Sequence, residues 1–319
     1  MENSGCWCDG IHKFIFYIGL IILFRYFFRF VFCIQRYFFR KGHNVQERYG
    51  QGSWILVTGA TDGTGKATAI YAAKEKGMNV VLVGRNKDRL LKAEKEVRTA
   101  NSSIDTRIYE FDFNKSTEIK DFMKISEEFK DLDISIFFSN AGVMTTKCIR
   151  DLSLEEIKEM TETNIHGPSI LTKIFTDRFA KRDKRSAIMI MGSVAGCTPL
   201  PNNSQYGATK AYLISFSKAV GYEISDKIDM IVSTPGFVKT KLNGYAENPL
   251  AVSPTHQAAS LFKDLGFERQ NMPIIGQEFA NNLLGIVYSL SESLGLAILG
   301  KIMIQERKEI ETYWEKQEK

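Results

Sequence analysis

The sequence predicts an α/β protein: a doubly wound, Rossmann-like parallel sheet with an N-terminal transmembrane helix and a C-terminal helical extension. From Trp54 onward, short apolar or β-branched runs alternate with longer amphipathic stretches, as is typical of βαβ units around a parallel sheet. Residues 14–34 are almost wholly apolar or aromatic. Beyond Gly236 the alternation stops, and apolar stretches return only between Phe279 and Met303.

The length and composition fit one globular domain with additions at both ends. The chain has 319 residues, of which 44% are hydrophobic and 25% charged, and these values exclude a disordered or collagen-like chain. We expect an anchor and basic linker over residues 1–48, a cofactor-binding catalytic domain over 49–270 and an extension over 271–319.

The net charge and the metal-binding residue types exclude two kinds of partner. The formal charge of +5 is spread along the chain without a nucleic-acid-binding motif, so we expect a membrane surface and no nucleic acid. The five cysteines have gaps that fit neither a disulfide framework nor a zinc site, and no two of the four histidines form a metal-binding pair on one helix face. We expect no metal.

The apolar segment that starts at Phe14 and ends at Ile34 is predicted to be a membrane anchor. Its 21 residues suffice to cross a hydrocarbon core of about 30 Å. Arg25 and Arg29 cost about 3 kcal/mol each on an insertion scale, which roughly fifteen apolar side chains outweigh. A cleaved signal peptide is disfavoured, because the stretch is too long and no small-residue cleavage site follows.

The basic residues around this segment predict its orientation. Only Lys13 precedes the span, whereas Arg36, Arg40, Lys41 and Arg48 follow it. By the positive-inside rule the globular part lies on the cytoplasmic side.

Four arginines predict a stripe along the anchor helix. Arg25, Arg29, Arg36 and Arg40 fall within about 60° of one face of a helix with 3.6 residues per turn. Charges in a membrane helix usually face a partner or the interface, so we expect anionic lipid head groups or an acidic partner subunit there. The alternative is that Arg36 and Arg40 only set the topology, with Arg25 and Arg29 snorkelling to the same interface.

Six strands are expected in the central region, with helices in the intervals between them. The strands are residues 54–58, 79–84, 105–112, 133–139, 186–192 and 227–234. Gly77 follows a run of Ala, Lys and Glu and marks the end of the first of these helices.

A glycine-rich turn, TGATDGTGK, follows the first strand and precedes a helical pattern that begins near Ala67. Such a turn lets the backbone approach a pyrophosphate, and the helix N-terminus supplies N–H groups and partial positive charge. Three glycines alone are also compatible with a tight structural turn, but the strand and helix context favours a dinucleotide. The contacts expected here are Gly59, Thr61, Gly63, Thr64 and Gly65.

The end of the second strand favours NADP(H) over NAD(H). An acidic residue about 20 positions beyond the glycines would bind the ribose hydroxyl of NAD, yet this stretch reads VGRNK. The guanidinium of Arg85 suits a 2′-phosphate instead. The alternative is that Arg85 is a solvated loop charge.

Tyr206 and Lys210 predict an acid–base pair. They are four residues apart on an expected helix and therefore share one face, where an ammonium is expected to lower the pKa of the tyrosine from about 10. Such a tyrosine can act as a general acid or base. A tyrosine that merely packs over a lysine stem is the alternative, but Ser193 and Asn164 stand nearby in the pattern and favour catalysis.

From Trp54 to about Leu242 the chain resembles the short-chain dehydrogenase/reductase family. The motifs that carry the resemblance are the glycine turn at 58–65, Asn140-Ala141-Gly142, Asn164, Ser193, Tyr206 with Lys210, and the run from Pro235 to Thr240. Thr64 and Ser139 depart from the usual family residues without removing a chemical group.

The resemblance implies the reaction and the role of each residue. The nicotinamide would give a hydride to a carbonyl carbon while Tyr206 donates the proton and Ser193 hydrogen-bonds the carbonyl oxygen. Lys210 would also hold the nicotinamide ribose, and Asn164 would fix a water for proton resupply. The remaining cofactor contacts expected from the resemblance are Asp112, Asn140, Pro235, Val238 and Thr240.

Within the family the chain is most similar to the very-long-chain 3-oxoacyl-CoA reductases and related 17β-hydroxysteroid dehydrogenases. It shares with them an N-terminal membrane segment, Thr-Asp-Gly at 61–63, the motif at 235–241 and a C-terminal apolar extension. The resemblance implies a lipid-like substrate and the endoplasmic reticulum membrane. The alternative is an accessory or scaffold subunit of a membrane complex, for example in the mitochondrial inner membrane, and a homo-oligomer is compatible with either.

The C-terminal apolar stretches, 283–290 and 294–303, are each too short to span a bilayer. We expect them to lie against the membrane surface or to close the substrate pocket. A plain core helix is the alternative.

Overall fold

The computed structural model describes residues 4–116, 118–245 and 248–317. The chain divides into two compact units, Met1–Lys41 and Gly42–Lys319. Residues 42–48, which the sequence assigns to the basic linker, lie in the larger compact unit.

The N-terminal unit is one long helix. α1 (Ser4–Ile34) continues into a π-helical turn, η1 (Gln35–Phe39). The stretch Gly10–Phe39 is long and apolar enough to cross a membrane, by length and composition. The helix therefore contains the predicted span and extends beyond both of its ends.

The predicted stripe of four arginines is wrong at its C-terminal end. The helical turn stops at Phe39, and Arg40 has extended backbone angles of φ −66° and ψ 128°. The π-helical turn also changes the residue spacing around Arg36. Only Arg25 and Arg29 lie on the regular helix α1.

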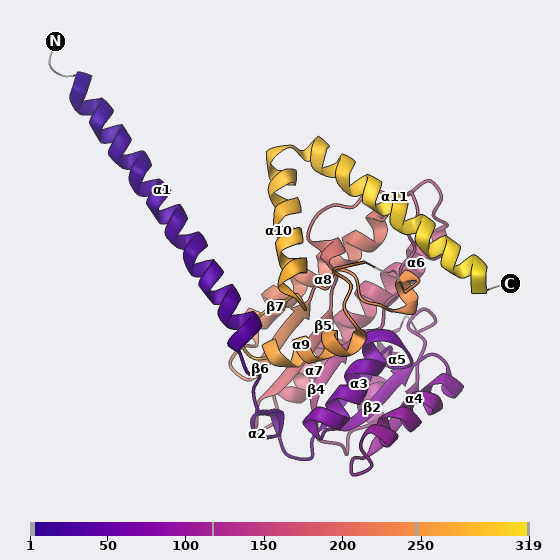
Figure 1. The fold of residues 1–319 in the computed structure, drawn as a ribbon. Coiled ribbons are helices and arrows are strands. Elements are labelled where there is room, and N and C mark those ends of the chain that lie inside the picture. The colour runs from indigo at the N-terminus through magenta and orange to yellow at the C-terminus, as the bar shows by residue number, and fades with distance from the viewer. Residues whose placement is uncertain (1–3, 117, 246–247, 318–319) are drawn as a thin grey trace. The chain divides into compact units, whose positions relative to one another are not determined.

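The larger unit is built on a seven-stranded parallel sheet with the order β3-β2-β1-β4-β5-β6-β7 (Figure 1). The strands are β1 (Trp54–Thr58), β2 (Asn79–Gly84), β3 (Thr106–Glu110), β4 (Ile134–Ser139), β5 (Ser186–Met191), β6 (Ile228–Ser233) and β7 (Gln270–Asn271). The six predicted strands are confirmed to within two residues at each end. The seventh was missed because it has only two residues, both polar.

Helices cover both faces of the sheet, which is why most strand residues are buried and apolar. Their bounds are α2 (Val45–Tyr49), α3 (Gly63–Lys76), α4 (Lys87–Ala100), α5 (Ile119–Glu128), α6 (Leu154–Thr161), α7 (Gly167–Phe179), α8 (Ser204–Glu223), α9 (Pro254–Asp264), α10 (Ile275–Leu290) and α11 (Glu292–Gln317), with short turns η2 (Glu162–His166), η3 (Val194–Gly196) and η4 (Lys241–Asn243). Side chains of α3, α4 and α9 join one hydrophobic cluster with the sheet, and those of α5, α7 and α8 join another. The fold is therefore doubly wound, as predicted.

The helix after the glycine turn begins earlier than predicted. α3 starts at Gly63 rather than near Ala67, because the side chain of Asp62 caps it by accepting a hydrogen bond from the Gly63 N–H at 2.7 Å. It ends as predicted at Gly77, which has a left-handed φ of 62°.

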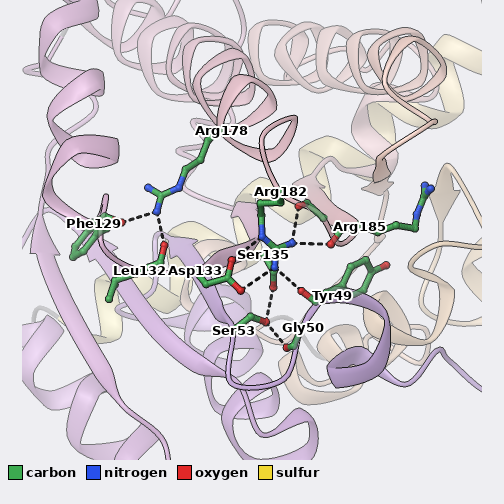
Figure 2. A network of polar contacts seen from close by, with 11 residues as sticks. Tyr49, Gly50, Ser53, Phe129, Leu132, Asp133, Ser135, Arg178, Arg182 and Arg185 are labelled. Carbon is green, nitrogen blue, oxygen red and sulfur yellow. Dashed lines mark hydrogen bonds and ion pairs between the residues drawn. The ribbon is translucent and has the colours of Figure 1, made fainter.

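A polar network ties the amino ends of the strands together, and Figure 2 shows Arg182 at its centre. The guanidinium of Arg182 donates to both carboxylate oxygens of Asp133 at 2.7 and 3.0 Å and to the Tyr49 carbonyl at 2.7 Å. It also donates to the Arg185 carbonyl at 2.7 Å and the Ser186 hydroxyl at 2.9 Å. All five donors of this side chain are thus used to join α2 to the starts of β4 and β5.

A buried carboxylate extends this network to the sixth strand. Asp229 accepts two hydrogen bonds from Arg48 at 2.7 and 3.0 Å, one from Tyr49 at 2.8 Å and one from Arg185 at 2.8 Å. Burial alone would raise the pKa of Asp229, but these bonds lower it below its ordinary value. The segment before β1 is therefore fixed to the sheet by charge pairing as well as by packing.

Candidate functional site

The carboxyl ends of the strands open into a cavity of about 1040 Å³. Its walls come from the glycine turn after β1, the end of β2, the loops after β3, β4, β5 and β6, and the helices α8, α10 and α11. A ligand site at the carboxyl ends is expected for an open α/β sheet. Two functional regions of the sequence, the glycine turn and the Tyr206 helix, thus face one space.

The glycine turn folds tightly against the sheet. Gly59 has a left-handed φ of +65°, and a Cβ there would lie 2.9 Å from the Cα of Ala141. At Gly65 a Cβ would overlap the carbonyl oxygen of Gly59. Gly65 does not line the cavity, so it permits close packing of α3 rather than a direct contact.

The turn fits the pyrophosphate of a dinucleotide. Thr61, Gly63 and Thr64 line the cavity, and the N–H groups of the first turn of α3 have no intrahelical acceptor. Such groups bind anions. The carboxylate of Asp62, which also stands here, is engaged by the Gly63 N–H and by the guanidinium of Arg89 at 2.8 Å.

Two arginines face the cavity beyond the end of β2. The side chain of Arg85 is 65% exposed and lies 3.6 Å from the carboxylate of Glu159, so it is accessible to a ligand. Arg89, on the first turn of α4, also lines the cavity. Sequence reasoning missed Arg89, although its position four residues after Arg85 was a usable signal.

The other predicted cofactor residues are brought to the same cavity. They are Asp112, Asn140, Pro235, Val238 and Thr240. Asn140 is held in place because its amide donates to the carbonyl oxygens of Thr58 at 3.0 Å and Gly59 at 3.3 Å. The Asp112 carboxylate accepts from the Asn114 N–H at 3.1 Å.

Ser193 and Tyr206 meet inside the cavity. Ser193 follows β5 in extended conformation and accepts from the Ala195 N–H at 3.1 Å, and its hydroxyl is close enough to the phenol of Tyr206 to lower the pKa of that phenol. Burial nevertheless raises the pKa of Tyr206 to about 12, and the carboxyl of Glu306 raises it further. The expectation of a lowered tyrosine pKa is therefore wrong for this structure.

The position of Lys210 explains why the pKa of Tyr206 is not lowered. Its Nζ donates to the carbonyl oxygen of Met191 at 2.8 Å and lies 5.5 Å from the centre of the Tyr206 ring. Burial lowers the pKa of Lys210 to about 8. The two residues share a helix face, as predicted, but the ammonium points at the end of β5 instead of the phenol oxygen.

Asn164 lies beneath the cavity rather than on its surface. It sits in the π-helical turn η2 and is fully buried. Its amide accepts from the Val143 N–H at 2.9 Å and donates to the Val143 carbonyl at 2.9 Å and the Thr209 hydroxyl at 3.1 Å. Asn164 therefore positions the loop after β4 against α8, and its predicted contact with a water remains a prediction.

The C-terminal helices form the remaining wall, which agrees with the expectation that they close the pocket. The amide of Gln277 fixes the start of α10 by accepting from the Gly236 N–H at 2.9 Å and donating to the carbonyls of Phe237 at 3.1 Å and Leu250 at 2.7 Å. Their cavity-lining residues are Ala280, Asn281, Leu284, Leu299, Ile302, Met303, Gln305, Glu306 and Glu309. The sequence held no signal for Glu306, because it lies nearly a hundred residues beyond Lys210 and outside every motif.

Comparisons with known proteins agree with this architecture. A model of the short chain dehydrogenase family matches residues 53–250. The very-long-chain 3-oxoacyl-CoA reductase of Coccidioides immitis is 34% identical over 210 residues, which cover 65% of this chain and 58% of that protein. The inactive hydroxysteroid dehydrogenase-like protein 1 of Homo sapiens is 32% identical over 194 residues, 60% of this chain and 57% of that protein. The chain thus matches less than two thirds of the length of these relatives.

Similarity reaches further along the chain in one relative and in solved structures. The very-long-chain 3-oxoacyl-CoA reductase of Schizosaccharomyces pombe is 28% identical over 311 residues, covering 93% of this chain and 89% of that protein. A 7β-hydroxysteroid dehydrogenase structure has 25% identity and a TM-score of 0.70, covering 81% of this chain and 99% of that one. An alcohol dehydrogenase from Thermococcus sibiricus complexed with 5-hydroxy-NADP has 25% identity and a TM-score of 0.60, covering 69% and 95%.

Proposed function

Since this chain belongs to the short-chain dehydrogenase family, we propose that it is a membrane-anchored, NADPH-dependent reductase of a lipid-like carbonyl compound, with a long-chain 3-oxoacyl-CoA as the first candidate and a ketosteroid as the second. The observation that carries the proposal is the convergence of Ser193, Tyr206 and Lys210 on the cavity that the glycine turn also lines. An oxidoreductase of this family needs those groups at one place.

The residues divide the chemistry of reduction between them. A bound nicotinamide supplies the hydride that the carbonyl carbon receives. Because the pKa of Tyr206 is about 12, the phenol is neutral at physiological pH and holds the proton that the carbonyl oxygen needs. The Ser193 hydroxyl, which lines the cavity beside this phenol, orients the same oxygen, so the carbonyl becomes an alcohol and Tyr206 regains a proton from solvent.

NADPH is preferred to NADH in this proposal because of charge at the end of β2. Arg85 is exposed there, Arg89 on the first turn of α4 lines the same cavity, and a guanidinium fork matches a phosphate. The Thermococcus sibiricus enzyme, which is similar to this chain, was solved with an NADP derivative. The present partners of Arg85 and Arg89, Glu159 and Asp62, are partly exposed carboxylates at the same cavity, and such ion pairs stabilise only weakly.

A lipid-like substrate suits the other half of the cavity. The side chains there are largely apolar, as at Met144, Leu200, Leu284, Leu299 and Met303, and such a lining gains free energy by covering an acyl chain or ring system. An anchor over residues 10–39 would hold the enzyme where such substrates partition. We place it in the endoplasmic reticulum membrane with the globular unit towards the cytoplasm, following the basic residues after the span.

A second function is favoured by one comparison. A relative of similar identity is named an inactive hydroxysteroid dehydrogenase-like protein, which supports an accessory or scaffold role within a membrane complex. The complete set of Asn164, Ser193, Tyr206 and Lys210 in this chain supports the enzyme.

The deciding experiment offers two substrates side by side. Detergent-solubilised full-length protein is given NADPH with a long-chain 3-oxoacyl-CoA or a 17-ketosteroid, and oxidation of NADPH is followed by absorbance. We expect turnover of the 3-oxoacyl-CoA. If the protein binds NADPH but oxidises it with neither compound, the accessory role is favoured.

A further inference from the structure

Helix α11 lies across the loops that follow the strands. Asn203 contacts the sulfur of Met303 at 4.0 Å, the guanidinium of Arg307 lies 3.9 Å from the Asp151 carboxylate, and the rings of Tyr245 and Tyr313 are 5.6 Å apart. These contacts fix which face of the helix looks into the cavity.

Glu306 lies on that inward face. It lines the cavity together with Tyr206, and its charge is close enough to raise the pKa of Tyr206. Its neighbours on the helix have partners: Arg307 bonds Glu311 at 2.7 Å, and Gln305 donates to Glu309 at 3.2 Å. Within the part of the chain that the structure describes, no hydrogen bond or ion pair joins Glu306 to another side chain.

A partly desolvated carboxylate without a hydrogen-bond partner raises the free energy of the folded protein unless a ligand contacts it. Burial raises the pKa of Glu306 to about 7, with Glu309 adding to the effect, so desolvation outweighs any stabilising neighbour. Ile302 and Met303, one helical turn before Glu306 on α11, line the cavity with it. A polar group that is partly desolvated and unpartnered inside a binding cavity is the usual form of a specificity contact.

We propose that Glu306 is a specificity-determining residue: its carboxylate accepts a hydrogen bond from a neutral donor on the substrate, an amide N–H or a hydroxyl, and repels an anionic group from the space beside Tyr206. This inference rests on the proposed function, since it concerns the substrate half of that site. It narrows the substrate class to compounds that carry no charge next to the reacting carbonyl, such as acyl thioesters whose carrier arm bears amides, and excludes free oxo acids.

The test must separate Glu306 from the other titratable groups of the cavity. Lys210, Lys241, Glu309 and Tyr206 line the same space, and Lys210 titrates near pH 8. A pH profile would mix these groups, so variants are compared at a single pH of about 8, where a free fatty acid is ionised.

The probes are decanamide and decanoate, which differ at the head group and have equal chain length. Their Kd values for full-length protein in detergent are measured by calorimetry, without turnover. Wild type should bind decanamide about tenfold more tightly than decanoate, a difference of about 1.4 kcal/mol. Glu306→Gln removes the charge at constant shape. It should lower the Kd of decanoate about tenfold and change the Kd of decanamide less than about threefold.

Two further variants complete the design. Glu306→Leu removes the acceptor and should raise the Kd of decanamide about fivefold relative to that of Glu306→Gln. Glu315→Gln makes the same charge change at an exposed position of α11 and should alter neither Kd. An unchanged decanamide-to-decanoate ratio in Glu306→Gln, or no binding of decanamide by wild type, overturns the inference. Failure of NADPH oxidation would instead overturn the proposed function, because the binding ratio does not depend on turnover.

Discussion

The ammonium of Lys210 donates a hydrogen bond to the carbonyl oxygen of Met191, 2.8 Å away. Met191 is the last residue of β5, and Ser193 follows it two residues later. The lysine therefore links the catalytic helix α8 to the strand end that presents the serine. Because it is buried, its charge is disfavoured and its pKa falls to about 8.

This lowered pKa predicts how cofactor use depends on pH. Lys210 is charged below about pH 8 and loses its proton above it, whereas Tyr206, with a pKa of about 12, stays protonated. If the ammonium holds the nicotinamide ribose, kcat/KM for NADPH should fall as the pH rises from 8 to 10. Lys210→Met should have a low kcat/KM without this fall. The same fall in the variant would assign it to another group.

Arg85 is expected to determine the preference between cofactors. Arg85→Ala should weaken NADPH binding about tenfold, because one charge-assisted contact to an exposed phosphate is worth about 1.4 kcal/mol, and should change NADH binding less than about twofold. Fluorescence titration of each cofactor measures both effects. Lys87→Ala, at an exposed position that does not line the cavity, is the matched control. Equal NADPH affinity in wild type and Arg85→Ala would show that Arg85 is only a solvated charge.

Arg182 is expected to stabilise the fold without affecting chemistry. Arg182→Ala removes five hydrogen bonds at the amino ends of the strands and leaves the buried carbonyl of Tyr49 without this donor, so it should lower the free energy of unfolding by about 3 kcal/mol. Urea denaturation followed by circular dichroism measures the change. The exposed neighbour variant Lys181→Ala should stay within about 0.5 kcal/mol of wild type. A similarly small change in Arg182→Ala would contradict a stabilising network.

Elements with strong periodicity could be predicted from the sequence, and elements that depend on remote contacts could not. Five of the six longer strands are mainly apolar runs between helices, a pattern that arises from burial on both faces. The edge strand β3, Thr106–Glu110, is more polar and only partly buried. β7 has two polar residues, Gln270 and Asn271, and is a strand only because β6 lies beside it. The start of α3 was misplaced because the capping role of Asp62 depends on its side-chain conformation.

The candidate site shows the same division. The shared location of Ser193, Tyr206 and Lys210 could be predicted from motif spacing, because local structure fixes their positions on a strand end and a helix. It could not give the direction of the Lys210 ammonium, which is set by the Met191 carbonyl. Glu306 reaches the site only because α11 folds back over the loops, and no local pattern encodes that path.

The central claim is that Tyr206 donates the proton in a reduction by NADPH. Its most direct test is Tyr206→Phe, which deletes one hydroxyl and keeps the ring that fills the buried site. With the long-chain 3-oxoacyl-CoA as substrate, the variant should retain NADPH affinity to within about threefold and lose turnover by at least about a hundredfold, the usual contribution of a positioned general acid. Turnover near the wild-type rate, with NADPH affinity unchanged, would contradict the claim.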